Sequence, residues 1–546
     1  MSLFSCSPIT RSRCIIITMR FNWAILGLLA VLSDGVGAIR RMRRDVDRDQ
    51  LTYKANYFDQ KINHFPENGL PYCNETFTQR YYFDDSYYEP GGPVYLYIGG
   101  ETSGPSRFSN LQNGIIQILM QETKGLGVIL ENRYYGESYP FATSTTDQLA
   151  FLTTAQTIAD NAYFAQNAVF PGIDGDLNAP GTPWILYGGS LAGAQTAFSV
   201  KQHGDVLYGG IAASAPIEVV IGYPEWYNPI QKFAPQDCVA RINNIVDNFD
   251  MLIAKNLTSA VNEFKALFGL EVLTDNRDFA AAIADPIGNP GFYLSSTWQE
   301  LNWNSSYGSR DFFYFCGNVS DIDPPEDIAQ VDYALSNYTN GAPWVGLGSY
   351  AHYVKNYVLP LCRSGDYNMN GECWGTQNQS YWEDVTNSGT RSYIYTSCVE
   401  QGAYIDAPKE GPALLSRVID TSYEQQWCTW AFPDGEYNKI PSSPDIDTYN
   451  SFGGFNFSAD RLAFIDGDQD VWNGLCYHSD LAPPRQQTSD LHPEMFITGA
   501  GHHWDSYGIL DVDAEPQFIR EAHYWEIRTV KKWLRDFSSW KPEKKA

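Results

Sequence analysis

A serine flanked by glycines follows a short apolar run, in the sequence Gly188-Gly189-Ser190-Leu191-Ala192-Gly193. This pattern is typical of a nucleophile elbow, with Ala192 at the last position of G-x-S-x-G. Such a turn needs small neighbours, exposes the serine hydroxyl and directs the next backbone N–H, that of Leu191, at an oxyanion. We interpret Ser190 as a candidate nucleophile; an ordinary Gly-Ser turn between a strand and a helix is the alternative.

A serine hydroxyl is a weak nucleophile unless a histidine accepts its proton and an acid orients that histidine. The C-terminal third supplies three aspartates within residues 466–470 and the pair His502-His503, each group directly after an apolar run. The resulting chain order of Ser, acid and His is the order found in α/β-hydrolases. A metal site is disfavoured because the histidines lack ligand partners at helical spacing, and a calcium loop because the aspartates lack the required Gly and distant Glu. The residues alone leave open which aspartate and which histidine act.

Apolar runs that end in glycine-rich or polar turns recur along the chain. We interpret them as buried strands at residues 93–98, 127–130, 184–187, 210–214, 392–395, 462–465 and 494–498. Helical patterns alternate with them, most clearly at residues 191–201 and 516–537. Alternating strands and helices predict an α/β fold with a doubly wound, mostly parallel sheet, whose ligands bind at the carboxyl ends of the strands.

The sequence changes character between residues 225 and 390, where helical stretches such as 238–268 are followed by loops rich in Tyr, Trp and Asn. We interpret residues 225–390 as an inserted, mainly helical cap domain that contains disulfides. The core is then split into residues 52–224, which hold the nucleophile, and residues 391–546, which hold the acid and the base.

The N-terminal segment 1–38 has the features of a signal peptide. An apolar run of about ten residues follows Arg20, which is too short to span a bilayer, and Val36-Gly37-Ala38 forms a cleavage site. The basic residues that follow make 39–51 either a pro-segment or a linker. No later stretch reaches the 18 apolar residues of a membrane helix, so we expect a secreted or a vacuolar or lysosomal protein without a membrane span.

Cysteines and glycosylation sequons agree with the secretory pathway. Removal of the signal peptide leaves eight cysteines, an even number without zinc-type spacing, so we expect a full set of disulfides. They are Cys73, Cys238, Cys316, Cys362, Cys373, Cys398, Cys428 and Cys476. We expect several of seven sequons to be glycosylated: Asn74, Asn256, Asn304, Asn318, Asn337, Asn378 and Asn456.

Composition excludes some classes of function. Hydrophobic residues make up 43% and aromatic residues 15% of the chain, which indicates a folded, core-building protein. Lys and Arg number 37 against 64 Asp and Glu, a formal net charge of -27, and this excess disfavours binding to nucleic acid. The same charge is compatible with an acidic compartment.

The chain resembles the proline-specific serine peptidases, the family of prolyl carboxypeptidase, dipeptidyl peptidase II and fungal acid prolyl endopeptidases. The segments that carry the resemblance are 57–65, 97–101, 131–138, the Ser190 elbow, 466–472 and 499–505. The resemblance implies an α/β-hydrolase fold with a helical cap, no cofactor or metal, and cleavage after proline. Val471 stands where the family usually has Pro, and such departures near the cleft bear on the proline preference more than on hydrolysis.

The resemblance also selects the site residues. The family motif N-G-x-x-D-P-W falls on residues 466–472 and places the triad acid at Asp470, and G-A-H-H selects His502 as the base. We expect oxyanion donors at Leu191 and at Gly100 or Glu101. Trp472 is expected to face the substrate pocket, with core packing as its alternative.

The sequence therefore predicts a secreted serine peptidase that acts on peptides or proteins through Ser190, Asp470 and His502. A secreted esterase or lipase and a non-catalytic binding glycoprotein of the same fold are the alternatives. The choice between carboxypeptidase, dipeptidyl peptidase and endopeptidase stays open, as does a homodimer.

Overall fold

The computed structural model describes residues 48, 51–72, 74–288, 298, 303, 311–362, 370–484 and 488–541. The chain divides into two units, Met1–Arg48 and Asp49–Ala546, and every element below belongs to the second. The predicted signal peptide and nearly all of segment 39–51 lie outside the described residues. Within the described part, no helix combines the length and apolarity needed to cross a membrane.

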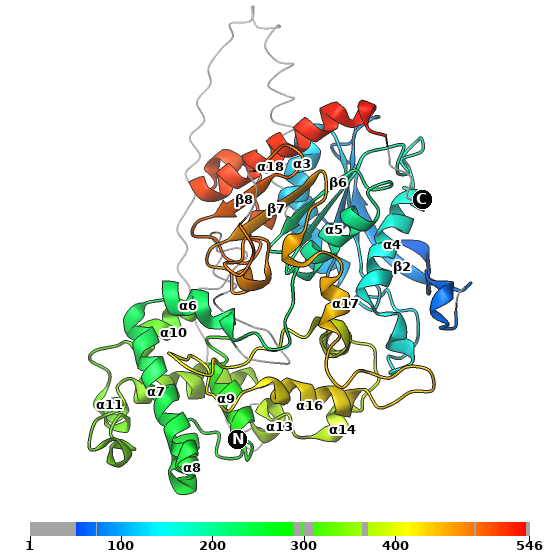
Figure 1. The fold of residues 1–546 in the computed structure, drawn as a ribbon. Coiled ribbons are helices and arrows are strands. Elements are labelled where there is room, and N and C mark those ends of the chain that lie inside the picture. Colours follow the sequence, from blue (N-terminus) through cyan, green and yellow to red (C-terminus); the bar gives the residue numbers. More distant parts are fainter. Residues whose placement is uncertain are drawn as a thin grey trace, which may run out of the picture. The chain divides into compact units, whose positions relative to one another are not determined.

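One eight-stranded sheet forms the centre of the second unit (Figure 1). Its spatial order is β1-β2-β4-β3-β5-β6-β7-β8; β2 is antiparallel to both of its neighbours, and the strands from β4 to β8 run parallel. The strands are β1 Asn56–Lys61, β2 Thr76–Asp84, β3 Val94–Ile98, β4 Leu126–Leu130, β5 Trp184–Gly189, β6 Gly209–Ala213, β7 Leu462–Gly467 and β8 Glu494–Ile497. Six of the strands predicted from the sequence are thereby confirmed.

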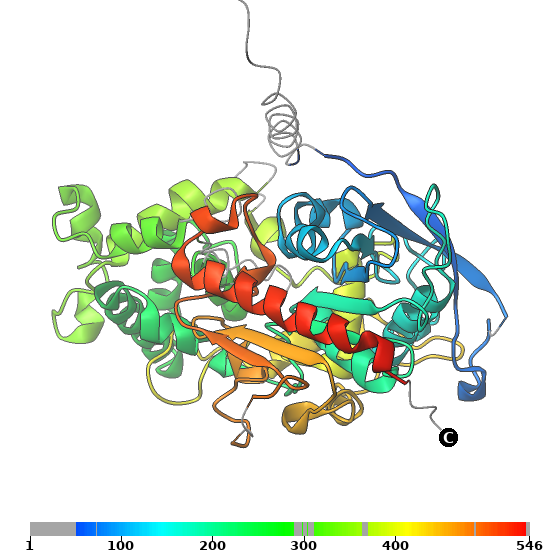
Figure 2. The same cartoon turned by 90° about the horizontal axis from the view of Figure 1, so that it is seen from above.

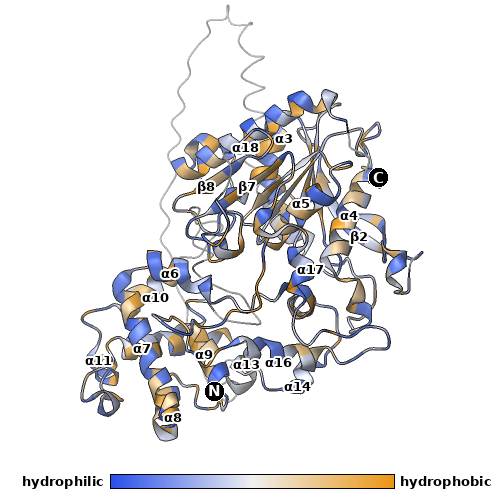
Figure 3. Ribbon diagram, viewed as in Figure 1, coloured by the Kyte–Doolittle hydropathy of each residue, from blue (hydrophilic) through white to orange (hydrophobic). Residues whose placement is uncertain are grey.

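Helices cover both faces of this sheet, because successive side chains of a strand point to opposite faces. Tyr95 and Tyr97 of β3 belong to the apolar cluster that includes helices α3 (Ile115–Thr123) and α18 (Gln517–Asp536). Leu96 belongs instead to a cluster with α4 (Thr154–Asn167), and α5 (Leu191–Gln202) packs beside it. Figure 2 shows α18 along one face of the sheet, and Figure 3 shows hydrophobic residues concentrated in the central strands.

A long helical insertion separates β6 from β7 and lies on one side of the sheet in Figure 1. Among the described residues, three disulfides join its helices and loops: Cys238–Cys316, Cys362–Cys373 and Cys398–Cys428. The predicted α/β-hydrolase architecture with a helical, disulfide-containing insertion is confirmed.

The helices not yet named are α2, which precedes β4, and those of the insertion. Their bounds are α2 Phe108–Gln112, α6 Asn228–Phe233, α7 Gln236–Ala254, α8 Thr258–Leu267, α9 Asn276–Ala284, α10 Asp311–Val319, α11 Glu326–Val331, α12 Leu347–Tyr353, α13 Asn370–Trp374, α14 Gln379–Trp382, α15 Gly389–Thr396, α16 Thr421–Ala431 and α17 Ile446–Asn450.

The strand predicted at residues 392–395 is wrong, because this segment lies in helix α15. Ser388 caps the helix: its side chain accepts a hydrogen bond from the backbone N–H of Arg391. The Ser392 hydroxyl donates to Tyr134 O in the core, so tertiary contacts outweigh the strand preference of this Tyr- and Ile-containing run. Among the described residues, the first strand after the insertion is therefore β7.

The expectation of a complete disulfide set is also wrong. A third disulfide joins Cys398 to Cys428, but Cys476 is a free, buried thiol, and Cys73 lies outside the described residues. The thiol of Cys476 hydrogen-bonds instead to Trp472 O at 3.2 Å. Burial raises the pKa of Cys476 well above its usual value, which keeps the thiol protonated.

Candidate active site

Ser190 occupies a strained turn between β5 and α5. Its backbone has φ 59° and ψ -130°, a conformation that L-residues with a side chain rarely adopt. A Cβ atom at Gly188 would lie 2.1 Å from Ala192 O, and one at Gly193 would lie 2.7 Å from Ala213 O, so both glycines are required for the turn to form. The predicted elbow geometry is present.

The three aspartates at the end of β7 and directly after it have separate partners. Asp466 accepts hydrogen bonds from the backbone and ring of His478, and Asp468 accepts the backbone N–H of Gly499 at 2.7 Å. Asp470 lies with both carboxylate oxygens 2.9 Å from Nδ1 of His502. Only Asp470, among these three, contacts a histidine of the 502–503 pair.

The two adjacent histidines also have different partners. The Nδ1 atom of His503 pairs with the Ser506 hydroxyl at 3.0 Å, and its backbone N–H donates to the Ser214 hydroxyl. Burial, reinforced by the nearby His502 ring and Arg107, holds the pKa of His503 well below its ordinary value. His503 is therefore a neutral, packed side chain, and a Cβ at Gly189 would lie 2.8 Å from its ring.

A cleft of about 360 Å³ opens above the elbow. It brings together five of the predicted site residues, whereas Asp470 lies behind His502 and Gly100 lies outside the lining. The lining consists of Glu101, Ser190, Leu191, Pro216, Val219, Gly389, Thr390, Tyr393, Gln401, Gly402, Ala403, Tyr449, Trp472, Leu475, His502 and His503.

The turn after β3 borders the cleft next to Leu191. Gly100 has φ 69°, in the left-handed region, and a Cβ there would contact Ala192 and Arg107 at 3.5 Å. The Nε of Arg107 donates to Gly99 O at 3.1 Å, and its Nη2 lies 3.7 Å from a carboxylate oxygen of Glu101. Arg107 thus holds this turn in place, a role that no motif indicated.

Trp472 is both a wall of the cleft and part of the core. It is 8% exposed and stacks on Tyr223, with ring centroids 5.8 Å apart and an interplanar angle of 15°. Pro216, Val219 and Leu475 extend the apolar wall beside it. Among the described residues, no group of three or more His, Cys, Asp or Glu side chains is arranged to hold a metal ion.

Comparisons with known proteins identify the family of this chain. The model of the serine carboxypeptidase S28 family matches residues 60–290 and 329–520, which include the elbow, the aspartates and both histidines. A protein of Arthroderma benhamiae named "Probable extracellular serine carboxypeptidase" is 36% identical over 506 residues, 88% of this chain and 68% of its own. The chain belongs to the serine carboxypeptidase S28 family.

More distant S28 relatives align over most of their length. Serine protease vicPa of Bipolaris victoriae is 26% identical, with 85% of this chain and 86% of its own covered. The lysosomal Pro-X carboxypeptidase of Homo sapiens is 25% identical, with 89% of each chain covered. The predicted family and the predicted class of enzyme, a serine peptidase, are confirmed.

In this S28 peptidase the insertion supplies one wall of the cleft, which sequence reasoning missed. Thr390 and Tyr393 of α15 line the cleft together with Gln401 from the π-helical turn Ser397–Gln401. These residues carry no motif, and the segment resembles a strand, so only the folded chain brings them to Ser190.

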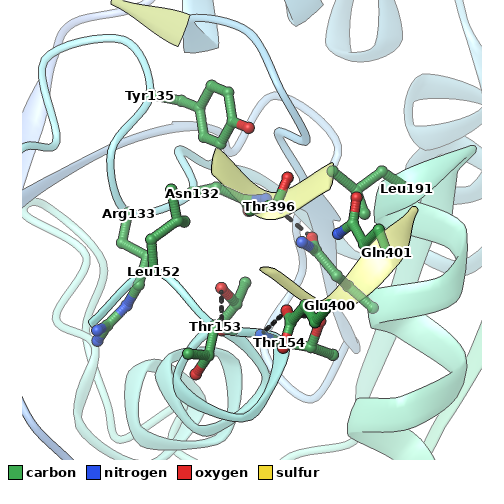
Figure 4. A pocket seen from close by; sticks show the side chains of 12 residues that line it. Asn132, Arg133, Tyr135, Leu152, Thr153, Thr154, Leu191, Thr396, Glu400 and Gln401 are labelled. Atoms are coloured by element: carbon green, nitrogen blue, oxygen red, sulfur yellow. Dashed lines mark hydrogen bonds between the residues drawn. The ribbon is translucent and has the colours of Figure 1, made fainter. Parts of the chain in front are cut away.

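A second, smaller cavity of about 10 Å³ lies behind Leu191 and has room for about one water molecule (Figure 4). Leu191 and Gln401 line both this cavity and the cleft. Glu400, on the insertion, accepts hydrogen bonds of 2.6 Å from both the N–H and the hydroxyl of Thr154 at the start of α4. Burial raises the pKa of Glu400 to about 7, although the bonds from Thr154 oppose the shift.

Six of the seven sequons fall on described residues. Asn318 is half-buried, and its amide donates to Tyr314 O within α10, whereas Asn304 lies outside the described residues. Glycosylation at all seven stays a prediction. The exposed positions are Asn74, Asn256, Asn337, Asn378 and Asn456.

Proposed function

We propose that this S28 family member hydrolyses peptide bonds after proline through a Ser190–His502–Asp470 triad and an acyl-enzyme. The observation that carries the proposal is the pairing of both Asp470 oxygens with Nδ1 of His502, in a cleft that His502 shares with Ser190. An aspartate on Nδ1 leaves the other ring nitrogen to exchange a proton with the nucleophile.

In the proposed reaction, Ser190 Oγ attacks the carbonyl carbon of the substrate while His502 removes the hydroxyl proton. His502 then returns that proton to the leaving amine, which departs as the acyl-enzyme forms. A water molecule then attacks the ester carbonyl of the acyl-enzyme while His502 removes its proton. His502 returns this proton to Ser190 Oγ, which leaves as the free hydroxyl. Asp470 orients the ring and stabilises the imidazolium.

The negative oxygen of each tetrahedral intermediate needs fixed donors. We assign this role to the backbone N–H of Leu191 and to that of Gly100 or Glu101, each worth about 3 kcal/mol in comparable enzymes. The strained backbone of Ser190 and the left-handed backbone of Gly100 support the assignment, because both conformations reorient peptide groups beside the cleft.

The preference for proline rests on the apolar wall of the cleft. Trp472, Pro216 and Leu475 offer flat or rigid apolar surfaces, which suit a pyrrolidine ring better than a flexible polar side chain. The human relative is named a Pro-X carboxypeptidase, which supports the same preference. We also propose that the protein acts in the secretory pathway, because relatives are named extracellular or lysosomal and the sequence begins with a signal-like segment.

Peptides that contain one proline and are blocked at the N-terminus, at the C-terminus or at both ends test this function. Mass spectrometry of the products should show cleavage after proline, and the pattern of tolerated blocks identifies the exo- or endopeptidase mode. Ser190→Ala should abolish cleavage while leaving the circular dichroism spectrum unchanged. A fluorophosphonate label on another serine, or hydrolysis of fatty esters without any peptide cleavage, would contradict the proposal.

A further inference from the structure

Glu526 is a buried carboxyl group without a partner. It lies on α18, is 0% exposed, and among the described residues neither of its side-chain oxygens has a hydrogen-bond partner. An ionised carboxylate in such a place loses its hydration without compensation, which is strongly unfavourable. A neutral carboxylic acid removes most of that penalty.

The surroundings of Glu526 connect it to the loop that carries His502. Asp505 follows this histidine by three residues, in the turn Trp504–Ser506, and is 1% exposed. The carboxylate of Asp505 accepts a 2.5 Å hydrogen bond from the hydroxyl of Tyr187. Tyr187 belongs to β5 and precedes Ser190 by three residues, so this bond ties the histidine loop to the strand of the nucleophile.

His523 adds a second connection one turn before Glu526 on the same helix. Its Nε2 lies 2.8 Å from the backbone oxygen of Asp505, and its Nδ1 lies 2.7 Å from a carboxylate oxygen of Glu515. Because a carbonyl oxygen only accepts, Nε2 must carry a proton, and a further proton lies between Nδ1 and Glu515. The His523–Glu515 pair is thus neutral as a whole and leaves no positive charge for Glu526.

We propose that Glu526 is a positioning residue that must remain an uncharged carboxylic acid for the His502 loop to keep its place. Three titratable groups interact electrostatically with it: Tyr187 from β5, Asp505 from the loop and Glu515 from the chain before α18; His523 of α18 pairs with Glu515. None of them supplies an unpaired positive charge. Loss of the proton would place a second negative charge beside Asp505 and push the loop away from β5.

The electrostatic environment agrees with this role. Burial raises the pKa of Glu526 well above its ordinary value of 4.5, and the carboxylates of Asp505 and Glu515 add to the rise. A raised pKa favours the protonated folded state, so the stabilisation is complete below about pH 4.5 and is lost as the pH rises toward the pKa of the folded protein. The neutral form of Glu526 therefore contributes most to the stability of the folded protein in the acidic range.

Glu526→Gln tests the proposal, because an amide has the shape of the acid but cannot ionise. We expect its kcat to persist to higher pH, with the alkaline limb moved upward by about one pH unit or more, while KM and the acid limb stay unchanged. Its melting temperature should also fall less steeply with rising pH than that of the wild type. Glu521→Gln is the matched control, because Glu521 is exposed on the same helix, and it should change neither profile.

Coincident alkaline limbs for Glu526→Gln and wild type would overturn the proposal. Because the amide adds donors of its own, Glu526→Met serves as a second neutral variant with similar volume. Failure of both variants to fold at pH 5 would show that an uncharged side chain cannot replace Glu526, which also overturns the proposal. Thermal unfolding is measured without substrate. If the protein cleaves no peptide, the proposed function is wrong, but the pH dependence of the melting temperature still tests the role of Glu526.

Discussion

Asp470 holds the ring of His502 through both carboxylate oxygens, and its Oδ1 also accepts the backbone N–H of Trp472 at 2.9 Å. The second bond fixes the carboxylate relative to the cleft wall, so the orientation of the ring and the shape of the pocket depend on the same side chain. Asp470 is 1% exposed, which strengthens both interactions by excluding water.

Asp470→Asn should lower kcat by about four orders of magnitude, because an amide opposite Nδ1 favours the wrong imidazole tautomer. Asp468→Asn in the same loop and Asp466→Asn at the end of β7 are matched controls, and both should retain most of the wild-type kcat. Steady-state kinetics with a proline-containing peptide provide the measurement. If Asp466→Asn is the inactive variant, the assignment of the acid is wrong.

The sequence alone predicts those parts of this site that depend on local sterics. The glycines around Ser190 identify the elbow because the turn cannot form with larger residues at 188 and 193. Asp466, Asp468 and Asp470 are identical in type and adjacent in sequence, so composition could not separate them. Family resemblance selected Asp470, and the folded chain shows the distance to His502 that favours the same choice.

Long-range contacts account for what the sequence did not predict. The helix α15 looks like a strand because its middle is Ser-Tyr-Ile-Tyr, and its actual state depends on a cap at Ser388 and a bond to Tyr134. An even number of cysteines suggested full pairing, yet Cys476 is a free thiol that donates to a backbone oxygen and, among the described residues, forms no disulfide. The cap at Ser388 lies next to α15 in the sequence, whereas the bond to Tyr134 has no signal within a few residues.

The two adjacent histidines should respond differently to mutation and to pH. His502→Ala should abolish activity, whereas His503→Gln should keep a large part of it. Because the pKa of His503 is depressed in the folded state, the unfolded chain takes up a proton below about pH 6.5 that the folded chain does not. The neutral His503 therefore does not weaken the folded state above that pH, and the free energy of unfolding decreases as the pH falls below it.

Denaturant unfolding of wild type and His503→Gln between pH 4 and 8 measures this difference. The wild type should lose stability relative to the variant as the pH falls below about 6.5. An inactive His503→Gln beside an active His502→Ala would reverse the assignment of the base.

Glu400 should make the contact between the insertion and α4 sensitive to pH. Its raised pKa favours the neutral acid in the folded state, so its contribution is complete below the ordinary value of 4.5 and is lost as the pH rises through about 7. Between these two pH values, the free energy of unfolding of Glu400→Gln should therefore rise relative to that of the wild type by on the order of 3 kcal/mol. Glu410→Gln, at an exposed position, is the control; parallel pH profiles for Glu400→Gln and wild type would contradict the prediction.

Cys476 should be invisible to thiol reagents in the folded protein and reactive after denaturation without reductant. Its burial and high pKa prevent thiolate formation in the native state. The comparison of wild type with Cys476→Ala isolates this residue: the denatured wild type should titrate one thiol more than the variant. If the variant instead titrates one thiol more than the wild type, Cys476 is in a disulfide, because its replacement frees the partner sulfur.

Trp472 should determine substrate preference more than catalytic competence. Trp472→Leu removes the flat surface beside the cleft and keeps an apolar side chain in the core, so kcat/KM for cleavage after proline should fall about 10- to 100-fold. Cleavage of a small activated ester, which does not fill the apolar wall, should change much less. Trp382→Leu is the matched control, because Trp382 is a buried tryptophan stacked on Trp427 and lies outside the lining of the cleft. If both variants lose ester and peptide hydrolysis equally, Trp472 acts through the fold; if only proline cleavage falls in Trp472→Leu, its surface recognises the substrate.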